Sequence, residues 1–323
     1  MLSRRKVLAS GAAMLAAPAL SRGARAAEFP DRSVRVFITT AAGGTSDIMA
    51  RLTSRHVSDQ LGKPFIIENR AGAGGNIATL AVHREPADGY TLLAVSRGNL
   101  LANVIYDRLE FDFARDFSGV ASIATGGLHM LVNPLVPAKT LPEFIGWAKA
   151  NPDKVNYGTP GNGTDPHFAA ELLKIAAGVS ITHVPYRGGA LALTDLISGN
   201  IQLMFSNLPV AEFIAKGQLR SLGVTSKTRA PDYPDVPAIA ESYPGFEVGV
   251  WHGFVARRNC PPEAISTLNR AYTAALSDPK VVAGLAPLGL TPEPMTTQDM
   301  DKFFAEDIEK WGKVARAANI KAN

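Results

Sequence analysis

Two glycine-rich turns, one in each half of the chain, carry the residues best suited to hold an anion. Residues 41–47, AAGGTSD, follow the apolar segment 34–39, and residues 158–165, GTPGNGTD, follow the short segment 155–157. Glycine lets backbone N–H groups point into a concavity, and the helix expected after each turn leaves its first N–H groups unpaired. The positive end of the helix dipole adds to this attraction. We therefore expect two seats for an anion such as a carboxylate, gripping one ligand between two lobes.

Two side chains at these turns each allow a structural and a functional interpretation. Asp47 either stabilises the first turn of its helix or accepts a hydrogen bond from a ligand amine or hydroxyl. His167 either donates to a ligand carboxylate or bonds the carbonyl groups of its own loop. We expect its imidazole to be neutral, because a helix N-terminus disfavours positive charge.

Two arginines are the cations nearest the expected cleft. Arg97 comes just after the strand expected at 91–95, and ligands of open α/β sheets bind at such strand ends. It either holds a ligand carboxylate through two parallel hydrogen bonds or is a solvated loop residue. Arg187 is expected to line the rim of the cleft or to pair locally.

Signatures of catalysis and of metal binding are mostly missing from the sequence. There is no G-x-x-x-x-G-K-[ST] loop and no G-x-S-x-G elbow, and the single cysteine, Cys260, has no base beside it. No histidine belongs to an H-x-x-x-H motif, and the chain contains no C-x-x-C motif. The histidines are His56, His83, His129, His167, His183 and His252. We expect no cofactor, no metal and no enzymatic activity, although a triad assembled by the fold would leave no sequence signal.

Strand-like and helix-like segments alternate after residue 30, which favours an α/β fold with mainly parallel sheets flanked by helices. A helix is expected over 166–177, with Asp165 as its N-cap and Pro166 in its first turn. Two hinge strands are expected near 120–124 and 248–254, where the chain crosses between lobes and returns. We place lobe one at 27–123 plus 250–323 and lobe two at 124–249.

The first 26 residues predict export. A basic start, Arg4, Arg5 and Lys6, precedes an apolar run of residues 7–20, and residues 24–26 fit an A-x-A cleavage site. The motif SRRKVL is typical of a twin-arginine signal, with an ordinary export signal as the alternative. These 26 residues carry five basic groups and no acid, so removing them changes the formal net charge from +4 to −1. A near-neutral mature chain disfavours nucleic-acid binding through a basic surface.

Several short motifs, in one order over nearly the whole mature chain, resemble a known family. The chain is similar to the substrate-binding proteins of tripartite tricarboxylate transporters, the Bug receptors. The resemblance runs from about Pro30 to the C-terminus and is carried by residues 42–47 (AGGTSD), 68–76 (ENRAGAGGN), 87–93 (ADGYTLL), 156–167 (NYGTPGNGTDPH) and 183–188 (HVPYRG).

The resemblance implies a two-lobed Venus-flytrap fold, a periplasmic location and a small organic acid as ligand. It implies that backbone amides of the loops hold the carboxylate, with ordered water bridging the lobes. The positions that match the family's binding residues are Gly43, Gly44, Thr45, Asp47, Ser96, Asn99, Thr159, Gly161, Gly163, Thr164, His167, Ser206 and Asn207. Ala42 of the first turn and Arg97 complete our candidate set.

Two departures bear on the ligand. The family's first loop usually carries prolines before its glycines, where this chain has residues 40–42, TAA. The positions around Arg97 are usually small or uncharged in the family, so Arg97 is expected to alter the class of ligand. The sequence thus predicts a monomeric receptor that delivers an organic acid to membrane permease subunits. The alternatives are a periplasmic enzyme acting on a small acid and a ligand-sensing partner of a membrane sensor kinase.

Overall fold

The computed structural model describes residues 29–152, 154–230 and 232–321, so the predicted export signal at 1–26 lies outside the described residues. The strands are β1 Val34–Ile38, β2 Phe65–Asn69, β3 Thr91–Ser96, β4 Phe117–Gly126, β5 His129–Val132, β6 Asn156–Thr159, β7 Thr182–Pro185, β8 Leu203–Ser206, β9 Arg220–Val224, β10 Val250–Arg257 and β11 Leu290–Pro292. The helices are α1 Thr45–Leu61, α2 Asn76–His83, α3 Arg97–Leu100, α4 Ala102–Ile105, α5 Phe113–Asp116, α6 Leu141–Ala150, α7 Asp165–Ala177, α8 Gly189–Ser198, α9 Ala211–Ala215, α10 Pro262–Ala275, α11 Pro279–Leu285 and α12 Thr297–Ala317.

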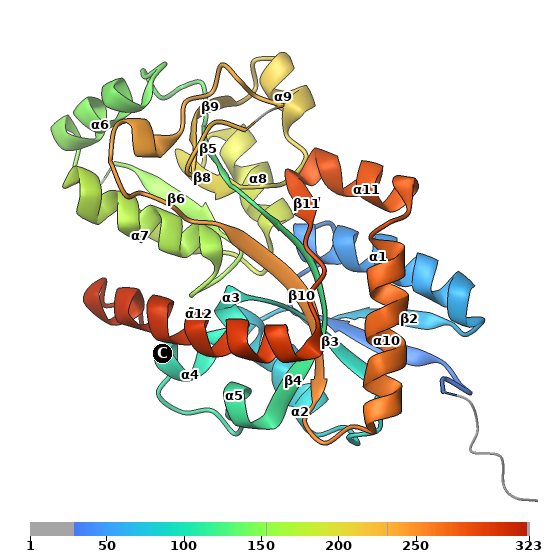
Figure 1. Cartoon of the computed structure of the whole chain (residues 1–323). Helices are drawn as coiled ribbons and strands as arrows, with labels where there is room; N and C mark the ends of the chain where they lie inside the picture. Colours follow the sequence, from blue (N-terminus) through green and yellow to red (C-terminus); the bar gives the residue numbers. More distant parts are fainter. Residues whose placement is uncertain (1–28, 153, 231, 322–323) are drawn as a thin grey trace, which may run out of the picture.

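These elements form two lobes, each built on one sheet (Figure 1). The first lobe contains the six-stranded sheet β11-β4-β10-β3-β1-β2, and the second contains the five-stranded sheet β7-β6-β8-β5-β9. The two-lobed α/β architecture is therefore confirmed. Both sheets are mixed: β1 pairs in parallel with β2 and β3, and β6 with β7 and β8, whereas β4, β5 and β10 pair antiparallel with their neighbours.

Burial follows the position of each strand in its sheet. The central strands β3 and β10 are buried at almost every residue, whereas the edge strands β2 and β7 are largely exposed or half-buried. The sequence of a strand that is covered by helices on both faces is a continuous apolar run, and residues 91–95 form such a run. Among the described residues, no helix has both the length and the apolar character that a membrane crossing requires.

Two long strands connect the lobes. β4 and β10 pair antiparallel from Phe117↔Arg257 to Gly126↔Val250, and both run from the first sheet toward the second lobe in Figure 1. The sequence predicted hinge strands at 120–124 and 248–254, within or beside these elements. After β4 the chain enters β5 of the second sheet, and after β9 it returns through β10. The lobe boundaries at 123/124 and 249/250 stay predictions.

Two local predictions need correction. The N-cap of α7 is Thr164, with φ −74° and ψ 160°, and the helix begins at Asp165 rather than at residue 166. Asp165 does not cap the helix, because its carboxylate turns toward Arg97 in the other lobe. Arg97, for which a loop position was one of two interpretations, opens the short helix α3 with Ser96 as its N-cap.

Candidate functional site

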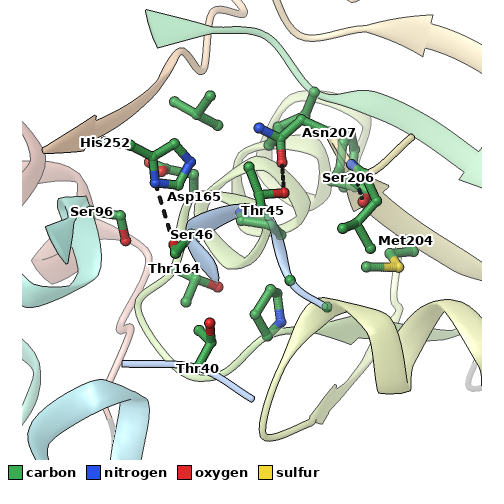
Figure 2. A pocket seen from close by; sticks show the side chains of 18 residues that line it. Thr40, Thr45, Ser46, Ser96, Thr164, Asp165, Met204, Ser206, Asn207 and His252 are labelled. Atoms are coloured by element: carbon green, nitrogen blue, oxygen red, sulfur yellow. Dashed lines mark hydrogen bonds between the residues drawn. The ribbon is translucent and has the colours of Figure 1, made fainter. Parts of the chain in front are cut away.

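A partly open cavity of about 60 Å³, which we call the inner chamber, lies between the lobes (Figure 2). It is formed where β1, β3 and β8 end and where α1, α7 and α8 begin. Its lining residues are Thr40, Gly44, Thr45, Ser46, Ser96, Leu128, Pro160, Thr164, Asp165, Pro166, Gly189, Met204, Phe205, Ser206, Asn207, Leu208, Val250 and His252. Half of the lining residues are nonpolar, and the polar half consists of six hydroxyl groups, one amide, one carboxylate and one imidazole.

A second cavity of about 380 Å³, the outer chamber, adjoins the first. The two chambers share Thr40, Ser96, Pro160 and Thr164. Exposed Arg187 lines the outer chamber, at the rim where the sequence placed it. The phenol of Tyr106 also lines it, and burial raises the pKa of that phenol.

The first glycine turn is closed by a side chain from its own helix. The N–H of Gly43 donates to Asp47 Oδ2 at 3.0 Å, while Asp47 Oδ1 accepts from Asn69 Nδ2 at 2.9 Å and from Arg51 Nε at 3.0 Å. Burial alone would raise the pKa of Asp47, but these three hydrogen bonds hold it below its ordinary value. The structure thus favours the structural interpretation of Asp47, which orders the turn from within.

The second glycine turn repeats this arrangement with a different side chain. The N–H of Gly163 donates to His167 Nδ1 at 3.0 Å, again between residues four apart. Gly43 has a φ of +81° and Gly163 a φ of +73°, a backbone conformation that favours glycine. Because Nδ1 of His167 is an acceptor, the imidazole carries its proton on Nε2, and it stabilises its own loop.

His167 belongs to a buried ring stack. Its ring lies 4.0 Å from that of His183, which lies 4.9 Å from Tyr157. His183 Nε2 is 2.7 Å from Thr159 Oγ1, so Thr159 supports the stack from the strand end. Burial lowers the pKa of His167 to about 4 and, with the neighbouring His167, that of His183 to about 3. Both rings are neutral at pH 7, as the sequence predicted for His167.

His252 lines the inner chamber, and its imidazole is neutral like those of His167 and His183. It lies on β10 opposite Ser96 of β3, and its Nδ1 is 3.4 Å from Ser46 Oγ. Burial lowers its pKa to about 4. A serine beside a histidine suggests nucleophile activation, but a general base works best with a pKa near the operating pH. His252 is thus a weak base, and the pair serves better as a polar wall.

These neutral histidines predict an acid-sensitive fold. A histidine whose pKa is lower in the folded state than in the unfolded chain, about 6.5, contributes stability that is complete above pH 6.5 and is lost as the pH falls through about 4. We expect His252→Asn, which keeps a polar group facing Ser46, to reduce the loss of unfolding free energy between pH 7 and 4.5 by about 2–3 kcal/mol. Urea unfolding at both pH values measures this difference. An unchanged loss in the variant would show that His252 does not titrate with the unfolding reaction.

Arg97 is buried and committed to partners in both lobes. It is 5% exposed, donates from Nε to Asp307 Oδ2 at 3.0 Å and from Nη1 to the carbonyl oxygen of Gly249 at 2.7 Å, and pairs with Asp165. Its guanidinium lies over the ring of Trp311 on α12, 4.3 Å from the centroid. Arg97 lines neither chamber. The solvated-loop alternative is wrong, and the hypothesis that Arg97 grips the ligand directly gives way to an ion-paired role beside the site.

The lobes touch in this structure. Thr45 Oγ1 of the first lobe donates to Asn207 Oδ1 of the second at 2.8 Å, and the N–H of Ala41 donates to the carbonyl oxygen of Arg187 at 3.0 Å. The ring of Phe168 on α7 packs edge-on against Trp311 on α12, 5.3 Å between centroids; Figure 1 shows these two helices alongside each other. With the Arg97–Asp165 pair, these contacts define a closed arrangement.

Buried polar atoms without hydrogen-bond partners indicate which ligand groups the inner chamber could bind. Asn207 is 8% exposed, and its Nδ2 has no hydrogen-bond partner among the described residues; the same holds for Thr40 Oγ1. The N–H groups in the first turn of α1 have no partner within the helix either. A buried donor without a partner costs free energy, so these groups are suited to a ligand oxygen.

The structure places part of the predicted set of ligand-binding residues around the two chambers. Of the candidate residues, Gly44, Thr45, Ser96, Thr164, Ser206 and Asn207 line the inner chamber, and Ser96, Asn99, Gly161 and Thr164 line the outer one. Ala42, Gly43, Asp47, Arg97, Thr159, Gly163 and His167 line neither, and most of them shape the turns from behind. Within the described ranges, no group of three or more histidine, cysteine or acidic side chains is arranged to hold a metal ion.

Sequence reasoning missed four polar residues that line the inner chamber: Thr40, Ser46, Asp165 and His252. Thr40 and Ser46 flank or lie within the first turn, so their position in the turn was an available signal. Asp165 was assigned to helix capping. His252 lies far along the chain, and only the pairing of β10 with β3 brings it to the site.

Comparison with known proteins agrees with this two-lobed fold. The family model described as tripartite tricarboxylate transporter family receptor matches residues 49–320. The chain belongs to this receptor family. One relative is protein BugT of Bordetella pertussis, 33% identical over 302 residues that cover 91% of each chain.

Solved structures of similar chains extend the comparison. A structure described as R. palustris Rpa4515 with adipate has a TM-score of 0.87 and 35% identity, covering 91% of this chain and 99% of that one. The periplasmic binding protein BugD has a TM-score of 0.87 and 28% identity, covering 91% and 100%. Both solved structures are thus similar to this chain over 91% of its length.

Proposed function

We propose that this protein is an exported, periplasmic solute-binding receptor. It captures a small organic acid in the inner chamber and delivers it to the membrane permease of a tripartite tricarboxylate transporter. Residues 1–26 act as its export signal, of twin-arginine type. No reaction on the ligand is required, and the receptor works as a monomer.

One observation carries the proposal: the chamber between the lobes offers unpaired donors for an anion without a lining lysine or arginine. The start of α1 and the buried Nδ2 of Asn207 supply N–H groups from the two lobes. Such groups, helped by bridging water, hold a carboxylate without a buried counter-charge. The adipate complex of a 35% identical family member supports the choice of a carboxylate.

Closure of the two lobes distinguishes the ligand-bound receptor from the empty one. A ligand shifts an open–closed equilibrium only by its difference in affinity for the two states. The donors of α1 and of Asn207 belong to different lobes, so one carboxylate reaches both only when the lobes meet. The closed form is then the one recognised by the permease.

Ligand binding without turnover tests this proposal. Mass spectrometry of compounds released from the purified protein identifies the ligand class, and thermal unfolding with added acids ranks it. A ligand added at a concentration of about 100 times its dissociation constant should increase the free energy of unfolding by about 2.7 kcal/mol. The compound should be recovered unchanged; its conversion to a product would refute the receptor and favour a periplasmic enzyme.

A further inference from the structure

The inner chamber contains one ionisable acid and no basic side chain that could balance it. Asp165 lines the chamber, whereas neither lysine nor arginine is among the lining residues. Its partner Arg97 is shared with Asp307, and all three groups are at least nine-tenths buried. One positive charge between two carboxylates leaves this cluster one positive charge short of neutrality.

The geometry leaves part of Asp165 available. Arg97 donates to Oδ1 of Asp165, and no donor among the described residues reaches Oδ2. Burial, together with the charge of Asp307, raises the pKa of Asp165 to about 6 in spite of Arg97. The carboxylate thus sits in an environment that still favours a further positive charge or a proton.

The opposite side of the chamber has the complementary character. Asn207 holds Thr45 through Oδ1 and keeps a buried Nδ2 without a partner. In Figure 2, Asp165, Ser96 and His252 are drawn on the left of the chamber and Asn207, Ser206 and Met204 on the right. A ligand carboxylate can accept hydrogen bonds from Asn207 and from the start of α1. At Asp165 it would instead be repelled by a carboxylate of the same charge.

We propose that the ligand is an amino acid, whose carboxylate is held by Asn207 and the start of α1 and whose ammonium group donates to Asp165. This proposal rests on the receptor function proposed above and narrows its ligand class. An ammonium group supplies the positive charge that the Arg97 cluster lacks. A plain dicarboxylate of similar length would add a second negative charge to the same chamber.

Matched pairs of ligands test the ammonium directly. Isothermal titration of the full mature chain compares aspartate with succinate and 2-aminoadipate with adipate, since each pair differs only by the amino group. We expect at least one amino acid to bind at least tenfold more tightly than its partner. In Asp165→Asn this preference should fall to threefold or less.

Asp307→Asn is the matched control, because Asp307 shares Arg97 but does not line the chamber. Asp307→Asn removes one negative charge from the cluster but leaves the Asp165 carboxylate in place to accept a hydrogen bond from the ammonium group, so it should keep at least a fivefold preference for the amino acid. Thermal unfolding checks that both variants fold. Equal or tighter binding of succinate and adipate by the wild type, or a preference that survives Asp165→Asn, would overturn the inference. Binding of the plain acids alone would leave the receptor function intact, whereas binding of none of these compounds, nor of citrate, would contradict the proposed function itself.

Discussion

Arg97→Met should lower the free energy of unfolding by about 3–5 kcal/mol, the cost of leaving buried carboxylates without their cation. Asp165 is 3% exposed and Asp307 is 7% exposed, so neither can recover its hydration while the lobes are closed. Methionine keeps much of the packing against Trp311 but provides no donor for the Gly249 carbonyl oxygen. Urea unfolding at pH 7.5 measures the loss.

A double variant separates charge from packing. If uncompensated charge is the cause, adding Asp307→Asn to Arg97→Met should recover at least half of the lost stability. Residues in one charge network are not expected to add independently. A loss below about 1 kcal/mol in the single variant, or no recovery in the double, would mean that the Arg97 cluster behaves like a solvated surface pair.

Gly98→Ala should reduce ligand affinity at least tenfold, about 1.4 kcal/mol, while leaving the unliganded fold as stable as the wild type. Gly98 lies in α3 of the first lobe, and a Cβ there would stand 2.9 Å from the carbonyl oxygen of Gly163 in the second lobe. A backbone carbonyl cannot turn aside as a side chain can. The clash exists only when the lobes are closed, so the open form is spared.

Titration of wild type and variant with whichever acid the wild type binds measures this effect, and small-angle X-ray scattering of the saturated proteins reports closure. Gly146→Ala on α6 is the matched control, because a Cβ there has nothing within 4 Å. Wild-type affinity in Gly98→Ala would mean that the bound receptor is more open than the structure described here.

The glycine turns show how far local sequence determines a site. Their residue types and spacing were sufficient to predict two strand-to-helix turns, and Gly43 and Gly163 do adopt positive φ. The sequence also suggested that both turns seat an anion. It did not reveal that Asp47 and His167 already occupy the Gly43 and Gly163 N–H groups, because a side chain four residues along can turn either inward or toward a ligand.

Arg97 shows where sequence reasoning is insufficient. Its position after β3 was predicted correctly, and either ligand contact or solvation was consistent with that position. Its actual partners, Asp165 and Asp307, lie 68 and 210 residues away. No local pattern records such a cluster, because the energy of a buried charge depends on which groups the fold brings around it.

What the sequence determined by itself is therefore the order of the elements, the two turns and the family, since these depend on short-range propensity and on motif order. The tertiary structure alone decided which polar atoms are left without partners. His252 reaches Ser46 only because β10 returns beside β3, and Asp165 enters the inner chamber because α7 closes against the first lobe. Charge balance and unsatisfied hydrogen bonds are properties of an enclosed space, and that space exists only after both lobes have folded and met.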